Sequence, residues 1–270
     1  MAKCWIELDK GSAADVLLKL PGGKTPGFDG NEEAAEQASD KLREELVTLQ
    51  ERLFAEEKHK VLVVLQAMDT GGKDGAIRKV FSGVNPQGVR VARFAAPTPE
   101  ELAHDYLWRV HREVPAKGQI VVFNRSHYED VLVVRVNDLA PAKVWKRRYE
   151  HLRNFERMLV DEGTTILKFY LHIDKEEQRE RLQARLDEPD KNWKFDEHDL
   201  EQRKHWKDYM AAFRDAIVET HRKDAPWFVI PANHKWFRDY AILKIIVGAL
   251  KKLDPEYPKP DFDPKQIKVE

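Results

Sequence analysis

A lysine and an aspartate lie close together in a glycine-rich segment, MDTGGKDG (68–75), which follows the apolar run VLVVLQA (61–67). A strand that ends in such a turn and continues into a helix presents backbone N–H groups and a helix N-terminus to an anion. Lys73 adds a full positive charge. The other residues expected to contact the anion are Thr70, Gly71, Gly72 and Gly75. The segment therefore predicts a phosphate-binding loop.

The loop departs in two places from the P-loop pattern, which has Gly, four residues, Gly-Lys and then Ser or Thr. Ala67 stands at the first glycine, and Asp74 stands where a hydroxyl would bind magnesium. Asp69 lies inside the loop, where a bare carboxylate would repel phosphate unless a cation lies between them. Asp69 therefore predicts a metal ion at the loop. The alternative is a plain strand-to-helix turn in which Asp69 caps the helix.

A second group of polar residues follows another apolar run, in the segment FNRSHYED. Asn124, which carries no charge, ends the run where a phosphate-loop fold often places a metal-binding acid. Arg125 comes next and could reach a phosphate with two N–H donors. Glu129 and Asp130 follow in a predicted first helical turn, where they either take over the metal and acceptor duties or are ordinary first-turn acids. His127 is expected to form structural hydrogen bonds and not to act in catalysis.

Basic side chains recur in a long insertion, 174–225, between two predicted strands. Arg181 and Arg185 are four residues apart and share one helix face. Lys191 and Lys194 follow in a predicted loop. Because nucleotide kinases carry a phosphate-closing lid at this point of the sheet order, the position favours a lid with arginines that hold phosphate. The alternative is a solvated helix held by Glu–Arg pairs.

Strands and helices alternate along the chain and would position these groups. The predicted strands are 61–66, 89–94, 119–124, 164–173 and 228–231. The predicted helices are 32–58, 73–81, 99–112, 141–162 and 235–252. This alternation predicts a three-layer α/β/α fold with a parallel sheet, whose carboxyl edge carries the phosphate loop. We expect one P-loop kinase-like domain over 1–270, with an N-terminal extension over 1–30 and a lid over 174–205.

Composition limits the class of protein. The chain has 270 residues, enough for a large buried core, and a net charge of −1, so no global field attracts nucleic acid or an anionic membrane. One cysteine, Cys4, excludes an internal disulfide and fits a reducing compartment. The N-terminal residues lack the apolar core of a secretory signal, and the longest apolar stretches are too short or interrupted to span a bilayer. We therefore expect a cytoplasmic protein.

The order and spacing of several segments resemble the family-2 polyphosphate kinases, from about Gly27 to about Leu253. The segments are MDTGGKDG, NPQG, FAAPTPEELAHDYLWRVH, FNRSHYEDVLV and DKEEQRERLQARLDEPDKNWKF. The resemblance implies a P-loop kinase fold with a helical lid. It also implies Mg²⁺-dependent phosphoryl transfer, with Mn²⁺ as a substitute, between inorganic polyphosphate and nucleotides. Asn124 with Glu129 and Asp130 is similar to the class III subgroup, which converts AMP to ADP and ADP to ATP.

The resemblance also implies roles for individual residues. Asp69 would bind the metal and orient the acceptor phosphate, with Asp130, or alternatively Glu129, as the second acid. Lys73 would neutralise the transferring phosphoryl group, and Arg125 would contact phosphate. The cations expected to hold the polyphosphate chain are Arg181, Arg185, Lys191 and Lys194. The candidates for the acceptor nucleotide are Arg78, Arg93 and Glu129, each of which could equally form a surface ion pair.

The expected partners are inorganic polyphosphate and adenine nucleotides, with guanine nucleotides as a further acceptor class. Neither nucleic acid nor a membrane is expected, and the resemblance implies a homo-oligomer, a dimer or a tetramer. Two other functions stay open on the sequence. An ATP-dependent nucleoside monophosphate kinase would share the fold but would normally carry the complete P-loop pattern. A non-catalytic polyanion-binding module would need basic residues but would have no use for Asp69.

Overall fold

A five-stranded parallel sheet forms the centre of the computed structural model, which describes residues 3–7 and 16–269. The strand order is β2-β3-β1-β4-β5. The strands are β1 (Lys60–Ala67), β2 (Val89–Arg93), β3 (Ile120–Asn124), β4 (Thr164–His172) and β5 (Trp227–Pro231). Every residue of β3 and β5 is buried, as expected for strands covered on both faces. The predicted α/β fold with a parallel sheet is confirmed.

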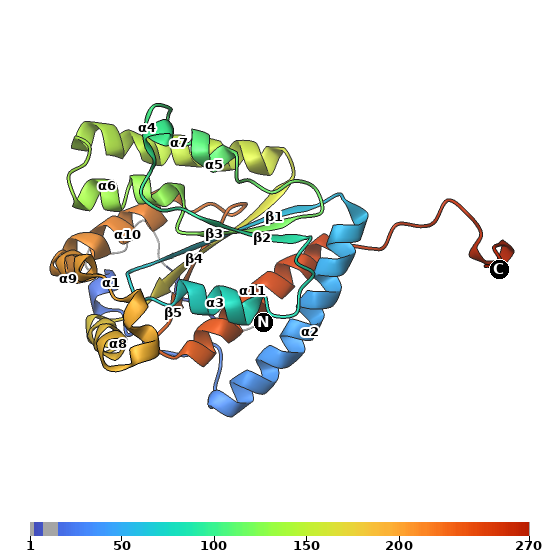
Figure 1. Cartoon of the computed structure of the whole chain (residues 1–270), viewed down its shortest axis with the longest axis horizontal. Helices are drawn as coiled ribbons and strands as arrows, with labels where there is room; N and C mark the ends of the chain where they lie inside the picture. Colours follow the sequence, from blue (N-terminus) through green and yellow to red (C-terminus); the bar gives the residue numbers. More distant parts are fainter. Residues whose placement is uncertain (1–2, 8–15, 270) are drawn as a thin grey trace.

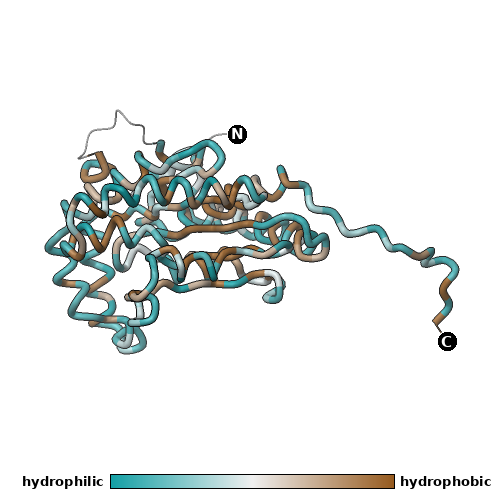
Figure 2. The backbone as a smooth tube through the Cα atoms, turned by 90° about the horizontal axis from the view of Figure 1, so that it is seen from above, coloured by the Kyte–Doolittle hydropathy of each residue, from teal (hydrophilic) through white to brown (hydrophobic). Residues whose placement is uncertain are grey.

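Helices cover the two faces of the sheet (Figure 1). One face carries α2 (Glu32–Glu56), α3 (Lys73–Val80) and α11 (Lys235–Leu253). The other face carries α7 (Ala142–Asp161), α10 (Trp206–Thr220) and the short α6 (Val133–Val136). A short α1 (Val16–Lys19) lies beside α10. Figure 2 shows the hydrophobic strands running through the middle of the molecule between these layers.

The single helix predicted over 99–112 is wrong. The structure has two short helices there, α4 (Pro99–Leu102) and α5 (Trp108–His111). The start of α4 has a capping box, because Thr98 accepts a hydrogen bond from the backbone of Glu101 and the side chain of Glu101 accepts one in return. The break has a local cause: Asp105 Oδ1 accepts a hydrogen bond from the backbone N of Leu107 at 3.0 Å, which competes with helical bonding.

The insertion 174–225 divides into two parts. The first consists of α8 (Lys175–Asp187), the 3₁₀ turn η2 (Pro189–Lys194) and α9 (Glu197–Lys204). These elements lie at one end of the sheet, on the left of Figure 1. The second part, α10, packs on α7 and belongs to the helical layer. The boundaries of the predicted lid, 174–205, correspond to the first part, and its movement stays a prediction.

The two ends of the chain differ in their contacts with the rest of the protein. Residues 1–2 and 8–15 of the predicted extension, and residue 270, lie outside the described residues. Within the described part, Ile6 bridges Val229 at the free edge of β5, and Cys4 is buried in the core. The tail after Leu253 projects from the body as an extended segment (Figures 1 and 2). No helix among the described residues is long and apolar enough to cross a membrane.

Candidate active site

The predicted phosphate loop connects the end of β1 to the first residue of α3. Two residues of the loop have left-handed backbone conformations: Thr70 with φ 64° and Gly72 with φ 94°. Gly71 donates its N–H to Met68 O at 2.9 Å, and a Cβ at Gly71 would approach Ala67 Cβ to 2.5 Å. The loop therefore needs glycine at 71 and 72 for close approach and for its backbone conformation.

Lys73 begins α3 and is almost completely buried. Its Nζ donates to the carbonyl O of Ala67 at 3.1 Å, so the side chain folds back over the loop. Burial lowers the pKa of Lys73, and the positive charge of Arg125 lowers it further, while Asp69 and Glu129 act in the opposite direction. Lys73 thus lies within electrostatic reach of both acids.

The end of β3 lies beside the end of β1, because Asn124 is in register with Leu65. The Asn124 amide donates to Asp74 Oδ1 at 2.7 Å, which ties β3 to the first turn of α3. Asp74 therefore stands where the P-loop pattern has the Ser or Thr that binds magnesium, and its carboxylate accepts a hydrogen bond from the Asn124 side chain. This contact explains how a neutral residue at 124 and an acid at 74 occur together.

Arg125 connects the loop with the following turn. It has a left-handed backbone, with φ 61°, and its N–H donates to Leu65 O at 3.2 Å. Its guanidinium Nη2 lies 2.9 Å from Asp69 Oδ1, and Nη1 lies 4.0 Å from Glu129 Oε2. Burial opposes the charge of Arg125, but Glu129 and Asp69 outweigh it and raise the pKa. Four predicted residues, 69, 73, 125 and 129, therefore form one cluster.

The two acids of the segment FNRSHYED lie on the 3₁₀ turn η1 (His127–Asp130) and have different partners. Burial raises the pKa of Glu129, although Arg125 and Lys73 oppose this. The Gln66 side-chain NH₂ donates to Glu129 Oε1 at 3.0 Å when its oxygen accepts from Ser126 Oγ at 2.9 Å. Asp130 instead accepts a bond from Arg148 Nη1 at 3.0 Å. Burial raises the pKa of Asp130 to about 6, against the opposing charges of Arg148 and Arg109.

A cavity of about 670 Å³ opens beside this cluster. Its polar end contains the acids and arginines of the site, which are Asp69, Arg109, Arg125, Glu129, Asp130 and Arg148. Apolar residues make up much of the remaining wall, among them Phe94, Ala95, Ala96, Pro97, Leu102, Leu132, Val133 and Leu139, and four further acids also line it, Glu101, Asp105, Asp196 and Asp199. A cavity that combines apolar walls with convergent charged groups is typical of a small-molecule site.

The predicted lid cations lie around the loop and at the tip of the lid. Arg181 donates to Thr70 O at 3.0 Å, to Ala232 O at 2.7 Å and to Glu177 at 2.6 Å, so it pins α8 to the loop. Arg185 forms an ion pair with Asp199 at 2.8 Å, which links α8 to α9 across the cavity rim.

The two lysines of turn η2 have other surroundings. Lys191 pairs with Glu188, and Lys194 lies over the ring of the exposed Trp193 at 5.0 Å. Neither lines the cavity. Their expected contact with polyphosphate stays a prediction.

Two acceptor candidates lie away from the cavity. Arg78 is exposed on the outer side of α3, and Arg93 is exposed at the end of the edge strand β2. Neither lines the cavity, whereas the third candidate, Glu129, does. A role for Arg78 or Arg93 in holding the acceptor therefore lacks support from their positions. His127 is buried with its Nε2 3.2 Å from Glu156 Oε1, so its predicted structural hydrogen bonding is confirmed.

Several residues near the site carry no signal in the sequence. Arg238 of α11 is 3% exposed, and its guanidinium fills the space that a Cβ at Gly72 would need. Gln178 of α8 donates to Asp69 O at 3.1 Å. Arg109 and Arg148 both face Asp130, and Arg148 lies 4.5 Å from the ring centre of Tyr106. Only the tertiary structure brings these residues to the loop, since they come from four separate helices or turns.

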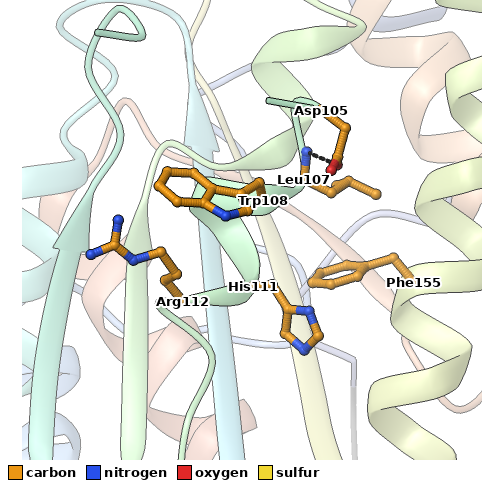
Figure 3. A pocket seen from close by; sticks show the side chains of 6 residues that line it. All are labelled: Asp105, Leu107, Trp108, His111, Arg112 and Phe155. Atoms are coloured by element: carbon orange, nitrogen blue, oxygen red, sulfur yellow. Dashed lines mark hydrogen bonds between the residues drawn. The ribbon is translucent and has the colours of Figure 1, made fainter. Parts of the chain in front are cut away.

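A second, smaller hollow lies between α5 and α7. Figure 3 shows its lining residues Trp108, His111, Arg112 and Phe155, with Asp105 and Leu107 at one end. Asp105 also lines the cavity of the site. No member of the charged cluster around the loop lines this hollow.

Comparison with known proteins places these features in a family. The family model "Polyphosphate kinase 2 (PPK2)" matches residues 29–258. An "AMP/ADP-polyphosphate phosphotransferase" of Meiothermus ruber is 59% identical over 254 residues, which cover 94% of this chain and 95% of the relative. An "ADP-polyphosphate phosphotransferase" of Rhodopseudomonas palustris is 43% identical and covers 90% of this chain and 88% of the relative.

A solved structure agrees with the sequence comparisons. The crystal structure of polyphosphate kinase 2 from Arthrobacter aurescens superposes with a TM-score of 0.91 and is 42% identical, covering 96% of this chain and 92% of the other. The resemblance predicted from the motifs is therefore confirmed. With its phosphate loop, its parallel sheet and these relatives, the chain belongs to the polyphosphate kinase 2 family.

Proposed function

We propose that this protein transfers the terminal phosphoryl group of inorganic polyphosphate to AMP and to ADP, in a reversible reaction that gives ADP and ATP. The observation that carries the proposal is the cluster of Asp69, Lys73, Arg125 and Glu129 between the phosphate loop and the cavity. The name of the Meiothermus ruber relative supports both AMP and ADP as acceptors, and the name of the Rhodopseudomonas palustris relative supports ADP.

The shape of the site suits a nucleotide acceptor and a linear donor. A cavity of about 670 Å³ has room for a nucleoside, and its apolar wall suits a base and ribose. A linear phosphate chain does not need an apolar wall. It needs only a row of cations. Arg238, Arg181 and Lys73 surround the loop on the side of α8 and α11, and would receive the chain there.

Catalysis would consist mainly of positioning and charge neutralisation, as phosphoryl transfer allows. Lys73 would neutralise the transferring group, and Arg125 would exchange Asp69 for a phosphate oxygen. The phosphate group of the acceptor would lie at the polar end of the cavity, near Arg125, with Arg109 and Arg148 as further cations there. Glu129 would face the acceptor from turn η1.

The donor set at the loop fits Mg²⁺. Among residues 3–7 and 16–269 no group of three or more His, Cys, Asp or Glu side chains is arranged to hold a metal. Mg²⁺ does not need such a group, since it is usually bound by one or two carboxylates together with substrate phosphates and water. Asp69 and Asp130 would hold the ion, with Glu129 as the alternative second ligand. When bound, the ion would neutralise charge on the phosphates.

The choice between the two acids can be tested by magnesium titration of the variants Asp130→Asn and Glu129→Gln. The variant that has lost a ligand will need a higher Mg²⁺ concentration for half-maximal rate. If Glu129→Gln shifts the Mg²⁺ requirement and Asp130→Asn does not, Glu129 is the second ligand.

The direct test of the function is a reaction of the purified protein with Mg²⁺, AMP and long-chain polyphosphate, without ATP, followed by chromatography. We expect ADP to appear first and ATP after it. ATP formed from ADP, with no product from AMP, would reject the acceptance of monophosphates. Product formed only when ATP is supplied as donor would instead indicate an ATP-dependent nucleoside monophosphate kinase.

The variant Asp69→Asn separates an enzyme from a polyanion-binding module. We expect the rate of transfer to fall by about 100-fold or more, as for the loss of one group that stabilises developing charge. Binding of polyphosphate, measured by a filter or fluorescence assay, should persist. An unchanged function in this variant would support the binding module. Use of guanine nucleotides and assembly into a dimer or tetramer are predictions for the same preparation.

A further inference from the structure

A closed polar network lies in the core directly beneath turn η1. Its members are completely buried and come from four elements: Tyr128 of η1, Glu156 of α7, Lys168 of β4 and Thr220 of α10. Lys168 Nζ donates to Glu156 Oε2 at 2.6 Å, to Thr220 O at 2.9 Å and to the Tyr128 hydroxyl at 3.1 Å. The Tyr128 hydroxyl donates to Glu156 Oε1 at 2.6 Å and lies 2.9 Å from Thr220 Oγ1.

The network satisfies its charged groups completely. The three N–H bonds of the Lys168 ammonium meet three acceptors, and both oxygens of Glu156 are bonded, since His127 Nε2 also lies 3.2 Å from Oε1. Burial opposes ionisation of Glu156, but Lys168 and His127 outweigh it and lower the pKa of that carboxyl. Glu156 and Lys168 are therefore a charged pair in a dry interior.

Such a pair is poorly explained as a source of stability. Removing two charges from water costs free energy that their attraction often only offsets, and apolar residues of similar volume are often as stable or more so. The neighbours of Lys168 along β4, Leu167 and Phe169, are themselves apolar and buried. What an ion pair with directed bonds adds is a defined geometry, and here that geometry is imposed on turn η1.

The side chains of turn η1 divide between the buried network and the active site. His127 and Tyr128 point into the core, and the next two residues, Glu129 and Asp130, line the cavity. The turn lies outside the sheet ladder, and Arg125 before it has a left-handed backbone. The inward side chains are therefore a main anchor of the acids on the other side.

We propose that the Glu156–Lys168 pair, acting through the Tyr128 hydroxyl, is a positioning device for the active site. It holds turn η1 so that Glu129 stays against Arg125 and Lys73 and Asp130 stays at the cavity. These core residues touch no substrate and are positioning residues. The inference rests on the proposed function, because the acids that it positions act in that reaction.

The test compares two substitutions of the same kind. Tyr128→Phe removes the hydroxyl that joins the turn to the pair. Tyr170→Phe is the matched control, because Tyr170 is also completely buried in the same core, and among the residues that the structure describes its hydroxyl has only Met210 Sδ, at 3.6 Å, as a partner. Kinetics and hydrogen exchange are measured well below the unfolding temperature of both variants.

We expect kcat for AMP and ADP to fall at least tenfold in Tyr128→Phe, while KM for polyphosphate changes less than twofold. Amide exchange over 126–132 should become faster. Tyr170→Phe should keep both kcat and the exchange of that segment. A merely structural hydroxyl would lower the melting temperature without separating kcat from KM.

Equal kcat and equal exchange in the two variants would overturn the inference while the function stands. If the wild-type protein transfers nothing from polyphosphate, the proposed function fails, and the exchange over 126–132 alone decides whether the pair anchors the turn. If Tyr128→Phe does not fold, the double variant Glu156→Gln with Lys168→Met serves instead, because it removes both charges of the pair and keeps side chains of similar size. Unchanged kcat and exchange in that variant would equally overturn the inference.

Discussion

At the scale of single residues, the cluster at the phosphate loop combines two acids with two basic side chains. Asp69 and Glu129 supply two carboxylates, and Lys73 and Arg125 supply two cations, all within mutual reach. A polyphosphate alone would bring excess negative charge, and a divalent cation alone would bring excess positive charge. Donor and metal should therefore bind together, each offsetting the charge that the other brings to this partly buried site.

The raised pKa of Asp130 predicts a dependence of stability on pH. Its pKa is about 6 in the folded protein and about 3.8 in an unfolded chain, so the folded state binds the proton more tightly. The stability that this carboxyl contributes is present at low pH and is lost as pH rises through 6. In Asp130→Asn this loss is absent, so the variant should gain up to about 3 kcal/mol relative to wild type between pH 4 and pH 7.

The measurement is urea unfolding of both proteins across that pH range. Asp187→Asn is a suitable control, because Asp187 is exposed at the end of α8. A difference between Asp130→Asn and wild type that stays constant from pH 4 to pH 7 would contradict the prediction.

Gly72 predicts a sharp loss of activity on substitution. In Gly72→Ala the added Cβ would meet Arg238 Nη1, and φ 94° would strain alanine as well. The loop must then shift, and a shift of about 1 Å costs about 100-fold in rate. The measurement is kcat/KM for polyphosphate, and a loss below threefold would show that Arg238 gives way without consequence.

The matched control is Gly248→Ala in α11. A Cβ at Gly248 would meet no atom within 4 Å. In the middle of a helix, alanine is more stable than glycine by about 0.5–1 kcal/mol. This variant should keep its activity and melt about 2 °C higher.

At the scale of elements, the base of the predicted lid is attached to the phosphate loop. Arg181 and Gln178 of α8 bond to the backbone of the loop at Thr70 and Asp69. Arg185 of α8 bonds to Asp199 of α9 and to the backbone of Lys194 in η2, and Arg203 of α9 adds bonds back to α8. Arg185 is therefore one of the side chains that hold the elements of the predicted lid together.

Arg185→Ala should consequently lose much more activity than Lys175→Ala. Removing Arg185 breaks one of the links between α8 and α9, at an acid that lines the cavity, and we expect a loss of about tenfold or more in kcat/KM, the equivalent of about 1.4 kcal/mol. Lys175 is exposed at the start of α8, and its loss should change the rate less than about twofold. Equal small losses in both variants would remove the argument for a functional lid.

At the scale of the whole molecule, the ends of the chain have opposite relations to the core. The N-terminal segment covers the edge of β5 and buries Cys4, with the Trp5 ring edge-on to Phe228 at 5.0 Å. The C-terminal tail lies away from the body, and its larger apolar side chains, Tyr257, Phe262, Ile267 and Val269, are exposed (Figure 1).

Deletion of residues 257–270 should therefore leave the enzyme intact. Because every described residue of this segment is exposed, we expect the free energy of unfolding to change by less than about 0.5 kcal/mol and kcat to stay within about twofold of wild type. Thermal unfolding and the polyphosphate assay check this. A large loss in either would mean that the tail packs on another surface, such as a second copy of the chain.

The order of strands and helices along the chain and the phosphate loop could be predicted from the sequence alone. Periodicity and β-branched runs are local signals, so β1, β3 and α2 were predictable almost to the residue. The loop was predictable because glycine, lysine and aspartate at 69–73 act through their own backbone and charge. The prediction of one helix over 99–112 was wrong because the Asp105 side chain accepts a hydrogen bond from the backbone of Leu107, which competes with helical hydrogen bonding.

The contacts between charged side chains of distant elements became visible in the tertiary structure alone. Arg238, Gln178 and Arg148 reach the site from distant helices, and no spacing in the sequence marks them. The same holds for the partner of Lys168, since a lysine inside an apolar strand becomes intelligible only when Glu156 is seen beside it. Electrostatic and hydrogen-bond partners depend on distances of a few ångströms across the fold, and local sequence patterns carry no information on those distances.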